Sequence, residues 1–163
     1  MIKGVLLFLF ISFYATISNY QETLVGNVVR IADGHTITIL TSNKKEFKIR
    51  LHGIDCPEKS QDFGSKAKAF TSDLCFGKTV FVRVTDIDRY GRFVGLVALP
   101  NGKILNRELL KAGLAWQYIK YDQSNDFRAL EATARLNRIG LWVKPNAIAP
   151  WEFRRSSYEP NFN

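Results

Sequence analysis

Hydrophobic and polar residues alternate in five stretches of the chain after residue 20, and this period of two predicts short β-strands. The first two stretches are rich in β-branched residues and are separated by Asp33-Gly34, a dipeptide that favours a tight turn. They therefore predict a hairpin. The five predicted strands are residues 25–31, 36–39, 46–51, 79–84 and 92–99.

Apolar residues recur at helical spacing in three other segments. The first, residues 64–76, ends before Gly77, which is a residue typical of a helix C-terminus. The second begins near Asn106 and ends at Gly113, and the third covers residues 126–139 and also ends before a glycine. These signals predict three helices.

The order of these elements is three strands, a helix, two strands and two helices, which predicts an α+β, mainly β fold. Such an order is typical of a five-stranded Greek-key barrel of the OB-fold type, here with three helices, whose second and third strands face the ligand. We expect residues 19–143 to form this single domain. Residues 144–163 are basic and aromatic without periodicity, so we expect an irregular C-terminal tail there.

The N-terminal segment has a different pattern. Lys3 precedes an apolar run over residues 4–14, and small and polar residues follow it. This arrangement is typical of a signal peptide, here residues 1–18, and predicts a secreted or periplasmic protein. Because no charged residue occurs over residues 4–21, an uncleaved leader that anchors the chain in a membrane is the alternative.

Composition narrows the class of protein further. Of the 163 residues, 46% are hydrophobic and 13% are aromatic, which excludes an intrinsically disordered chain. The formal charge of +8 indicates a polyanionic partner, either nucleic acid or an acidic membrane surface. Cys56 and Cys75 lack the spacing of a zinc site. Export permits a disulfide between them, and two half-buried thiols are the alternative.

Acidic and basic residues cluster at residues 33–36, 50–58 and 88–92. Hydrolysis of a phosphodiester needs a carboxylate to deprotonate water, a cation to bridge phosphate oxygens, and guanidinium groups to hold the charge that grows on phosphorus. Arginine suits the last role because its planar group donates two parallel hydrogen bonds to phosphate. The clusters offer all three, whereas any one cluster alone is more simply interpreted as solvated charges at a turn.

Together the three clusters resemble the staphylococcal nuclease family. They follow that family's order as Asp33-Gly34-His35-Thr36, as the segment from Arg50 to Glu58, and as Asp88-Arg89-Tyr90-Gly91-Arg92. The likeness continues through residues 106–115 and 140–142, so it covers roughly residues 24–143. The resemblance implies the same barrel that the periodicity predicts, and the activity of a nuclease.

The resemblance also implies a role for each matching residue. Glu58 would be the general base that activates water, and Arg50 and Arg92 would hold the phosphate in the transition state. Asp55 and the backbone carbonyl of Cys56 would bind a calcium ion (Ca²⁺). These residues form the predicted catalytic and metal sites.

His35 stands where the family has a second carboxylate ligand. Calcium prefers oxygen ligands and its affinity follows the number of charged ligands, so a neutral imidazole would weaken the site. Imidazole suits manganese or zinc better, which makes Mn²⁺ or Zn²⁺ the alternative cofactor if His35 is a ligand. We therefore expect a metal-dependent, sequence-nonspecific endonuclease that hydrolyses DNA and RNA to 3′-phosphate products, weakened or metal-altered by His35. The alternative function is a secreted OB-fold module that binds nucleic acid and barely cuts it.

Further residues match the family's nucleic-acid contacts. Arg89 and Tyr90 match the residues beside the scissile phosphate, and Tyr118 and Tyr121 flank Lys120 in the segment that holds the nucleotide. Aromatic rings beside a lysine fit stacking on the bases of single-stranded or frayed DNA and RNA. Packing at the barrel rim is the alternative interpretation of the two tyrosines. We expect a monomer, and no protein partner is implied.

Overall fold

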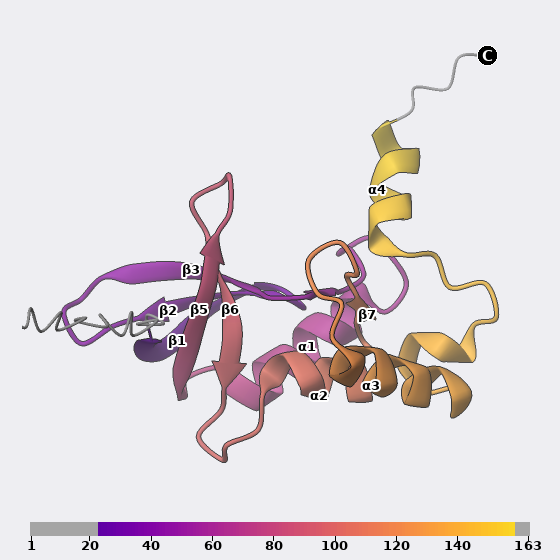
Figure 1. Ribbon diagram of the computed structural model, residues 1–163. Coiled ribbons are helices and arrows are strands. Elements are labelled where there is room, and N and C mark those ends of the chain that lie inside the picture. Colours follow the sequence, from indigo (N-terminus) through magenta and orange to yellow (C-terminus); the bar gives the residue numbers. More distant parts are fainter. Residues whose placement is uncertain (1–22, 159–163) are drawn as a thin grey trace, which may run out of the picture.

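The computed structural model describes residues 23–158, so the predicted signal peptide lies outside the described residues. Five strands close into a barrel (Figure 1), and their order around it is β1-β2-β3-β6-β5. The strands are β1 (Thr23–Asp33), β2 (Thr36–Leu40), β3 (Glu46–Leu51), β5 (Thr79–Ile87) and β6 (Phe93–Ala98). The predicted five-stranded barrel of the OB-fold type is confirmed.

The barrel closes through one parallel pair, β3 with β6, whereas the other neighbouring strands are antiparallel. In the parallel pair Arg50 lies opposite Val94. Arg92 is two residues before Val94, so closure of the barrel brings Arg50 and Arg92 to neighbouring strands. These two arginines are 42 positions apart in the sequence.

Aliphatic side chains from alternating strand positions fill the barrel. Each of the following is at most 1% exposed: Val28, Ile37, Ile39, Ile49, Leu51, Val80, Val82 and Val97. Burial of one such side chain stabilises the fold by about 1.5–3 kcal/mol, so the barrel is a firm support for residues on its strands.

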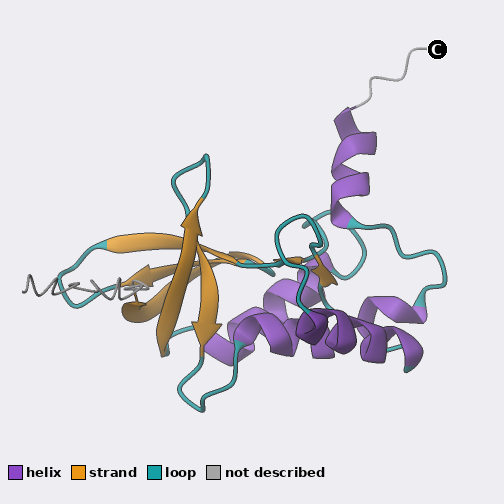
Figure 2. Cartoon of the chain, in the orientation of Figure 1, coloured by secondary structure: helices purple, strands orange, loops and turns teal. Residues whose placement is uncertain are grey.

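Three helices lie together at one end of the barrel (Figure 2), and they match the predicted ones. These are α1 (Gly64–Cys75), α2 (Leu105–Lys111) and α3 (Asn125–Leu136). A short antiparallel pair of β4 (Ile54–Asp55) and β7 (Trp116–Gln117) ties the segment after β3 to the segment after α2. The 3₁₀ helix η1 (Gly140–Val143) follows α3. No helix within residues 23–158 has both the length and the apolar character to span a membrane.

The expected irregular tail is wrong for part of its length, because Pro150–Tyr158 form a helix, α4. Proline suits the first position of a helix, where its missing N–H would have no partner within the helix. Much of this helix projects away from the barrel (Figure 1), and it is joined to the domain through residues distant in sequence, such as Trp116 and Tyr118, which contact Trp151.

The disulfide is also not formed, since Cys56 and Cys75 are both free and buried. The thiol of Cys75 donates a hydrogen bond to the carbonyl oxygen of Thr71 at 3.0 Å. Burial raises the pKa of Cys75 to about 12 and raises that of Cys56 well above its usual value. Both side chains are therefore neutral thiols that pack as small apolar groups.

Candidate functional site

The turn between β1 and β2 places His35 beside the segment after β3. The backbone N–H of His35 donates to Oδ1 of Asp33 at 2.8 Å, an interaction that stabilises a tight turn. A Cβ atom on Gly34 would lie 2.7 Å from Cβ of Ala67, so only glycine lets the turn rest on α1. The hydroxyl of Thr71 on α1 donates to the carbonyl oxygen of Gly34 at 2.7 Å and fixes the turn.

Asp55 is the centre of the site and is only 1% exposed. Its Oδ1 accepts a hydrogen bond from Nη2 of Arg50 at 2.9 Å, and its Oδ2 accepts one from Nη2 of Arg154 at 2.7 Å. Burial raises the pKa of Asp55, although the hydrogen bond from Arg154 and the charge of Arg50 lower it. A buried carboxylate thus has a guanidinium on each oxygen, which is the pairing that burial of a charge requires.

Glu58 lies three residues further and shares the second guanidinium. Nη1 of Arg154 donates to Oε1 of Glu58, so one arginine bridges both carboxylates. The Glu58 side chain is still 35% exposed and is therefore open to water. Its backbone is fixed from two sides: its N–H donates to Oε1 of Gln61, and its carbonyl oxygen lies 1.9 Å from where a Cβ on Gly64 would be.

His35 is buried and its ring is engaged by the backbone. The N–H of Cys56 donates to Nδ1 of His35 at 2.8 Å, which puts the proton of the neutral ring on Nε2, 3.6 Å from Oδ1 of Asp33. Burial, followed by the charges of Arg50, Arg154 and Arg92, holds the pKa of His35 well below its usual value. His35 is therefore a neutral side chain that supports the Cys56 backbone.

The predicted metal ligands do not fit a metal ion in this arrangement. Both oxygens of Asp55 accept hydrogen bonds from guanidinium groups, and Nδ1 of His35 accepts the Cys56 N–H. Within residues 23–158, no three or more His, Cys, Asp and Glu side chains are grouped so that they could hold a metal ion. Calcium affinity grows with the number of charged oxygen ligands, and here the one buried carboxylate is already neutralised.

Arg92 directly precedes β6 and belongs to a second cluster. Its Nε donates to Oδ2 of Asp88 at 2.6 Å, while the backbone N–H groups of Arg92 and Tyr90 donate to Oδ1 of the same residue. Tyr90 is 67% exposed and carries the guanidinium of Arg89 4.8 Å above its ring. The predicted residues Arg89, Tyr90 and Arg92 therefore share one exposed turn between β5 and β6.

The predicted stacking residues lie in the loop after β7. Tyr118 and Tyr121 have ring centroids 4.9 Å apart, and the ammonium group of Lys120 is 5.4 Å from the Tyr121 ring. Tyr118 also stacks on Trp151 of α4, with centroids 5.1 Å apart and ring planes within 6° of parallel. One face of Tyr118 is therefore covered, whereas Tyr121 is 58% exposed.

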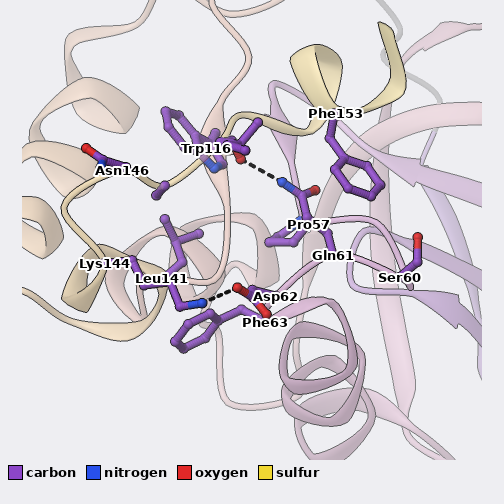
Figure 3. A pocket seen from close by; sticks show the side chains of 12 residues that line it. Pro57, Ser60, Gln61, Asp62, Phe63, Trp116, Leu141, Lys144, Asn146 and Phe153 are labelled. Carbon is purple, nitrogen blue, oxygen red and sulfur yellow. Dashed lines mark hydrogen bonds and ion pairs between the residues drawn. The ribbon is translucent and has the colours of Figure 1, made fainter. Parts of the chain in front are cut away.

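A cavity of about 350 Å³ is lined by Pro57 and residues 60–63 on one side and by the segment that leads into α4 on the other. Figure 3 shows its lining, with Pro57 and Phe153 on one side and Leu141 and Lys144 on another. Nε2 of Gln61 donates to the carbonyl oxygen of Ile148 at 2.7 Å, and Lys144 pairs with Asp62. These contacts tie the segment before α4 to the backbone that carries Glu58.

Arg154 and Trp151 are site residues that the sequence did not predict. They lie 99 and 33 positions from their respective partners Asp55 and Tyr118, so no local motif connects them. The one signal was the aromatic and basic composition of residues 151–155. Without a helical pattern, that composition did not indicate which side chain would turn toward the carboxylates.

Comparisons with known proteins find nucleases similar to this chain. Residues 48–144 match the family model described as "Staphylococcal nuclease homologue". A protein of Shigella flexneri named micrococcal nuclease is 41% identical over 142 residues, which cover 81% of each chain. An uncharacterized endonuclease of Escherichia coli O157:H7 is 40% identical over 129 residues, covering 79% of this chain and 84% of that one. A staphylococcal-like nuclease of Arabidopsis thaliana is 38% identical, over 85% of this chain and 43% of its own length.

Proposed function

The chain belongs to the staphylococcal nuclease family and is a hydrolase of the nuclease type, and on this premise we propose which substrates it cuts and how. The proposed reaction is sequence-nonspecific endonucleolytic hydrolysis of DNA and RNA at single-stranded or frayed regions, leaving 3′-phosphate ends. The observation that supports it most is the convergence of Arg50, Asp55 and Glu58 on one partly open site.

In the proposed reaction, Glu58 accepts a proton from a water molecule whose oxygen forms a bond to phosphorus. The bond from phosphorus to the 5′ oxygen breaks, and that oxygen takes a proton from solvent. The products are a 3′-phosphate and a 5′-hydroxyl, with one water consumed. Arg50 and Arg92 donate hydrogen bonds to the phosphate and offset the negative charge that grows on it.

Substrate binding is assigned to the two exposed clusters. Arg89 and Tyr90 in the β5–β6 turn would contact the backbone and a base near the cut, and Tyr121 with Lys120 would stack on a neighbouring base. Tyr118 has one face covered by Trp151, so it supports this surface from within. The protein would act as a monomer outside the cytoplasm, and the location depends on the leader pattern of residues 1–18 alone.

The test is cleavage of a fluorescent single-stranded DNA by the full chain and by Glu58→Gln. We expect the variant to lose about 100-fold or more in kcat while its Kd for DNA changes little, because the base acts on water and not on binding. The matched control is Glu46→Gln, which removes an exposed carboxylate at the other end of β3. Equal cleavage by all three proteins would contradict the mechanism, and binding without cleavage by the native chain would favour the nucleic-acid-binding module.

A further inference from the structure

The Arg154 guanidinium lies between the two carboxylates of the site, Asp55 and Glu58. We propose that the Arg154 guanidinium is the resident cation of the site, and that this chain cleaves phosphodiesters without a divalent metal. The inference rests on the proposed function, because it names what neutralises Asp55 and Glu58 during that reaction. It also gives the unexpected helix α4 a chemical role.

The geometry of the bridge carries the first step. Nη2 of Arg154 donates to Oδ2 of Asp55 and Nη1 donates to Oε1 of Glu58, so both ends of the planar group are engaged at once. Although burial lowers it, the hydrogen bonds to Asp55 and Glu58 raise the pKa of Arg154 above its usual value. A guanidinium stays charged at any working pH, so the bridge is a permanent positive charge.

The second step is that this arginine is held from several sides. Trp151 lies one helical turn earlier in α4 and packs between Tyr118 and Trp116, with centroid distances of 5.1 and 5.7 Å. Phe153 lines the cavity beside Pro57, and the segment before α4 is bonded to Gln61. The helix that carries Arg154 is therefore held in place by packing and by this hydrogen bond, in addition to the ion pairs of Arg154.

The third step is the charge of the site. Asp55 already pairs with Arg50 through its other oxygen, and His35 is a neutral ring that offers no carboxylate. A divalent ion would have to displace Arg154 and then bind beside Arg50 with one buried carboxylate. Calcium sites need more charged oxygen ligands than this. The replacement of an expected carboxylate by His35 therefore disfavours a divalent ion at this site, and so does the presence of Arg154.

In the reaction, Arg154 forms no covalent bond and transfers no proton. It keeps Glu58 beside Asp55 although both are anionic, and its exposed part, 37% of the side chain, faces the solvent from which the phosphate enters. The charge of the transition state then meets Arg50, Arg92 and Arg154. Such preorganised cations act most strongly where water is partly excluded.

The activity test compares the native full chain with Arg154→Ala, Arg154→Lys and the control Arg155→Ala on single-stranded DNA, in chelator and in Ca²⁺, Mn²⁺ or Zn²⁺. We expect the native chain to cut in chelator, with metals changing its rate less than about twofold. Arg154→Ala should lose about 100-fold, with part of the rate restored by millimolar guanidinium, and Arg154→Lys about 10-fold. Arg155 is exposed on the same helix, so its variant should keep the native rate.

Two results would overturn the inference and leave the proposed function intact. One is a native chain that cuts only when a metal is added, and the other is an Arg154→Ala rate equal to or above the native rate. The second would instead make α4 an inhibitory cover. Circular dichroism shows whether each variant is folded. If Arg154→Ala does not fold, Arg154→Lys takes its place in the comparison.

A binding measurement tests the inference without activity. In calorimetric titration with Ca²⁺ alone, we expect no binding heat from the native chain up to about 1 mM, a limit set by weak calcium sites. Binding at micromolar Ca²⁺ would overturn it. If no protein cuts under any condition, the proposed function fails, and this titration still decides whether Arg154 excludes the metal.

Discussion

His35 stands where the family resemblance implies a carboxylate. The surroundings of its side chain explain why a histidine is accommodated there. The ring accepts the Cys56 N–H through Nδ1 and lies 3.7 Å from Oδ1 of Asp55. A protonated ring would lose that acceptor and bring a further positive charge toward Arg50. The residue therefore acts in the folded chain as a neutral hydrogen-bond acceptor for the backbone beside Asp55.

This neutrality predicts a dependence of stability on pH. The pKa of His35 is lowered on folding from 6.5, so the unfolded chain binds more protons as the pH falls through 6.5. We expect the free energy of unfolding to fall by about 1 kcal/mol per pH unit in the window below 6.5, until the folded pKa is reached. Above 6.5 this contribution is fully present.

Urea denaturation at pH values between about 7.5 and 5.5 measures this slope. The matched variant is His35→Asn, whose side-chain oxygen can accept the same Cys56 N–H without titrating. Burial raises the pKa of Asp55 above 3.8, so protonation of Asp55 acts in the opposite sense and favours the folded state. Equal slopes for the native chain and His35→Asn would contradict a buried neutral histidine.

At the scale of elements, α1 holds the Glu58 backbone by close approach. A Cβ on Gly64 would lie 1.9 Å from the carbonyl oxygen of Glu58, whereas a Cβ on Gly77, just after the same helix, would meet nothing within 4 Å. Gly77 has a φ of +72°, a left-handed conformation that costs other residues about 1–2 kcal/mol. Replacement of Gly64 therefore tests the cost of a steric clash, whereas replacement of Gly77 tests the cost of an unfavourable backbone conformation.

We expect Gly64→Ala to lower the free energy of unfolding by about 3 kcal/mol or more, because backbone must move to relieve the clash. Gly77→Ala should cost only about 1 kcal/mol. Gly64→Ala should also cleave DNA more slowly than Gly77→Ala, since Glu58 moves with its carbonyl. Both effects are read from urea midpoints and from initial rates, and equal losses of stability would contradict the close approach.

The elements also show how far the sequence predicts this molecule. Alternation identified β2 and β3, and helical spacing identified α1 and α3, because these elements are long enough for their period to repeat. The strands β4 and β7 have two residues each, too few to show a period. Helix α4 carries mixed aromatic and basic residues whose partners are distant in sequence, so its structure depends on contacts that no local pattern encodes.

The same limit applies to the site. Arg50, Asp55 and Glu58 lie within nine residues and match one motif, and the structure brings their side chains together. Arg154 completes this group through contacts across 99 and 96 positions, which a motif cannot include. The free state of Cys56 and Cys75 was one of two alternatives that spacing left open, because spacing does not determine how two cysteines are oriented.

For the whole molecule, the formal charge of +8 predicts binding that weakens with salt. If three arginines contact phosphates of a single strand, the Kd should rise about 20-fold between 50 and 200 mM salt. Fluorescence anisotropy with DNA strands of several unrelated sequences measures this Kd at each salt concentration. Similar Kd values are expected for all strands, because phosphate and stacking contacts do not read sequence.

Variants locate this charge on the surface. Arg89→Ala should reduce the slope of log K against log salt by about 0.7, which is the share of one phosphate contact. The control is Lys45→Ala, an exposed residue in the turn between β2 and β3 at the other end of the barrel from His35. A slope that falls equally in both variants would mean that the general charge, and not the β5–β6 turn, attracts the nucleic acid.

The long span between Asp55 and Arg154 sets an order of events during synthesis on the ribosome. The barrel strands and both carboxylates leave the ribosome well before residue 154, which has to fold back over 99 positions to reach Asp55. A growing chain that has not yet reached α4 therefore carries an incomplete centre while it lies beside the messenger RNA that encodes it. The position of one arginine in the sequence thus delays assembly of the centre until the chain has been translated through α4.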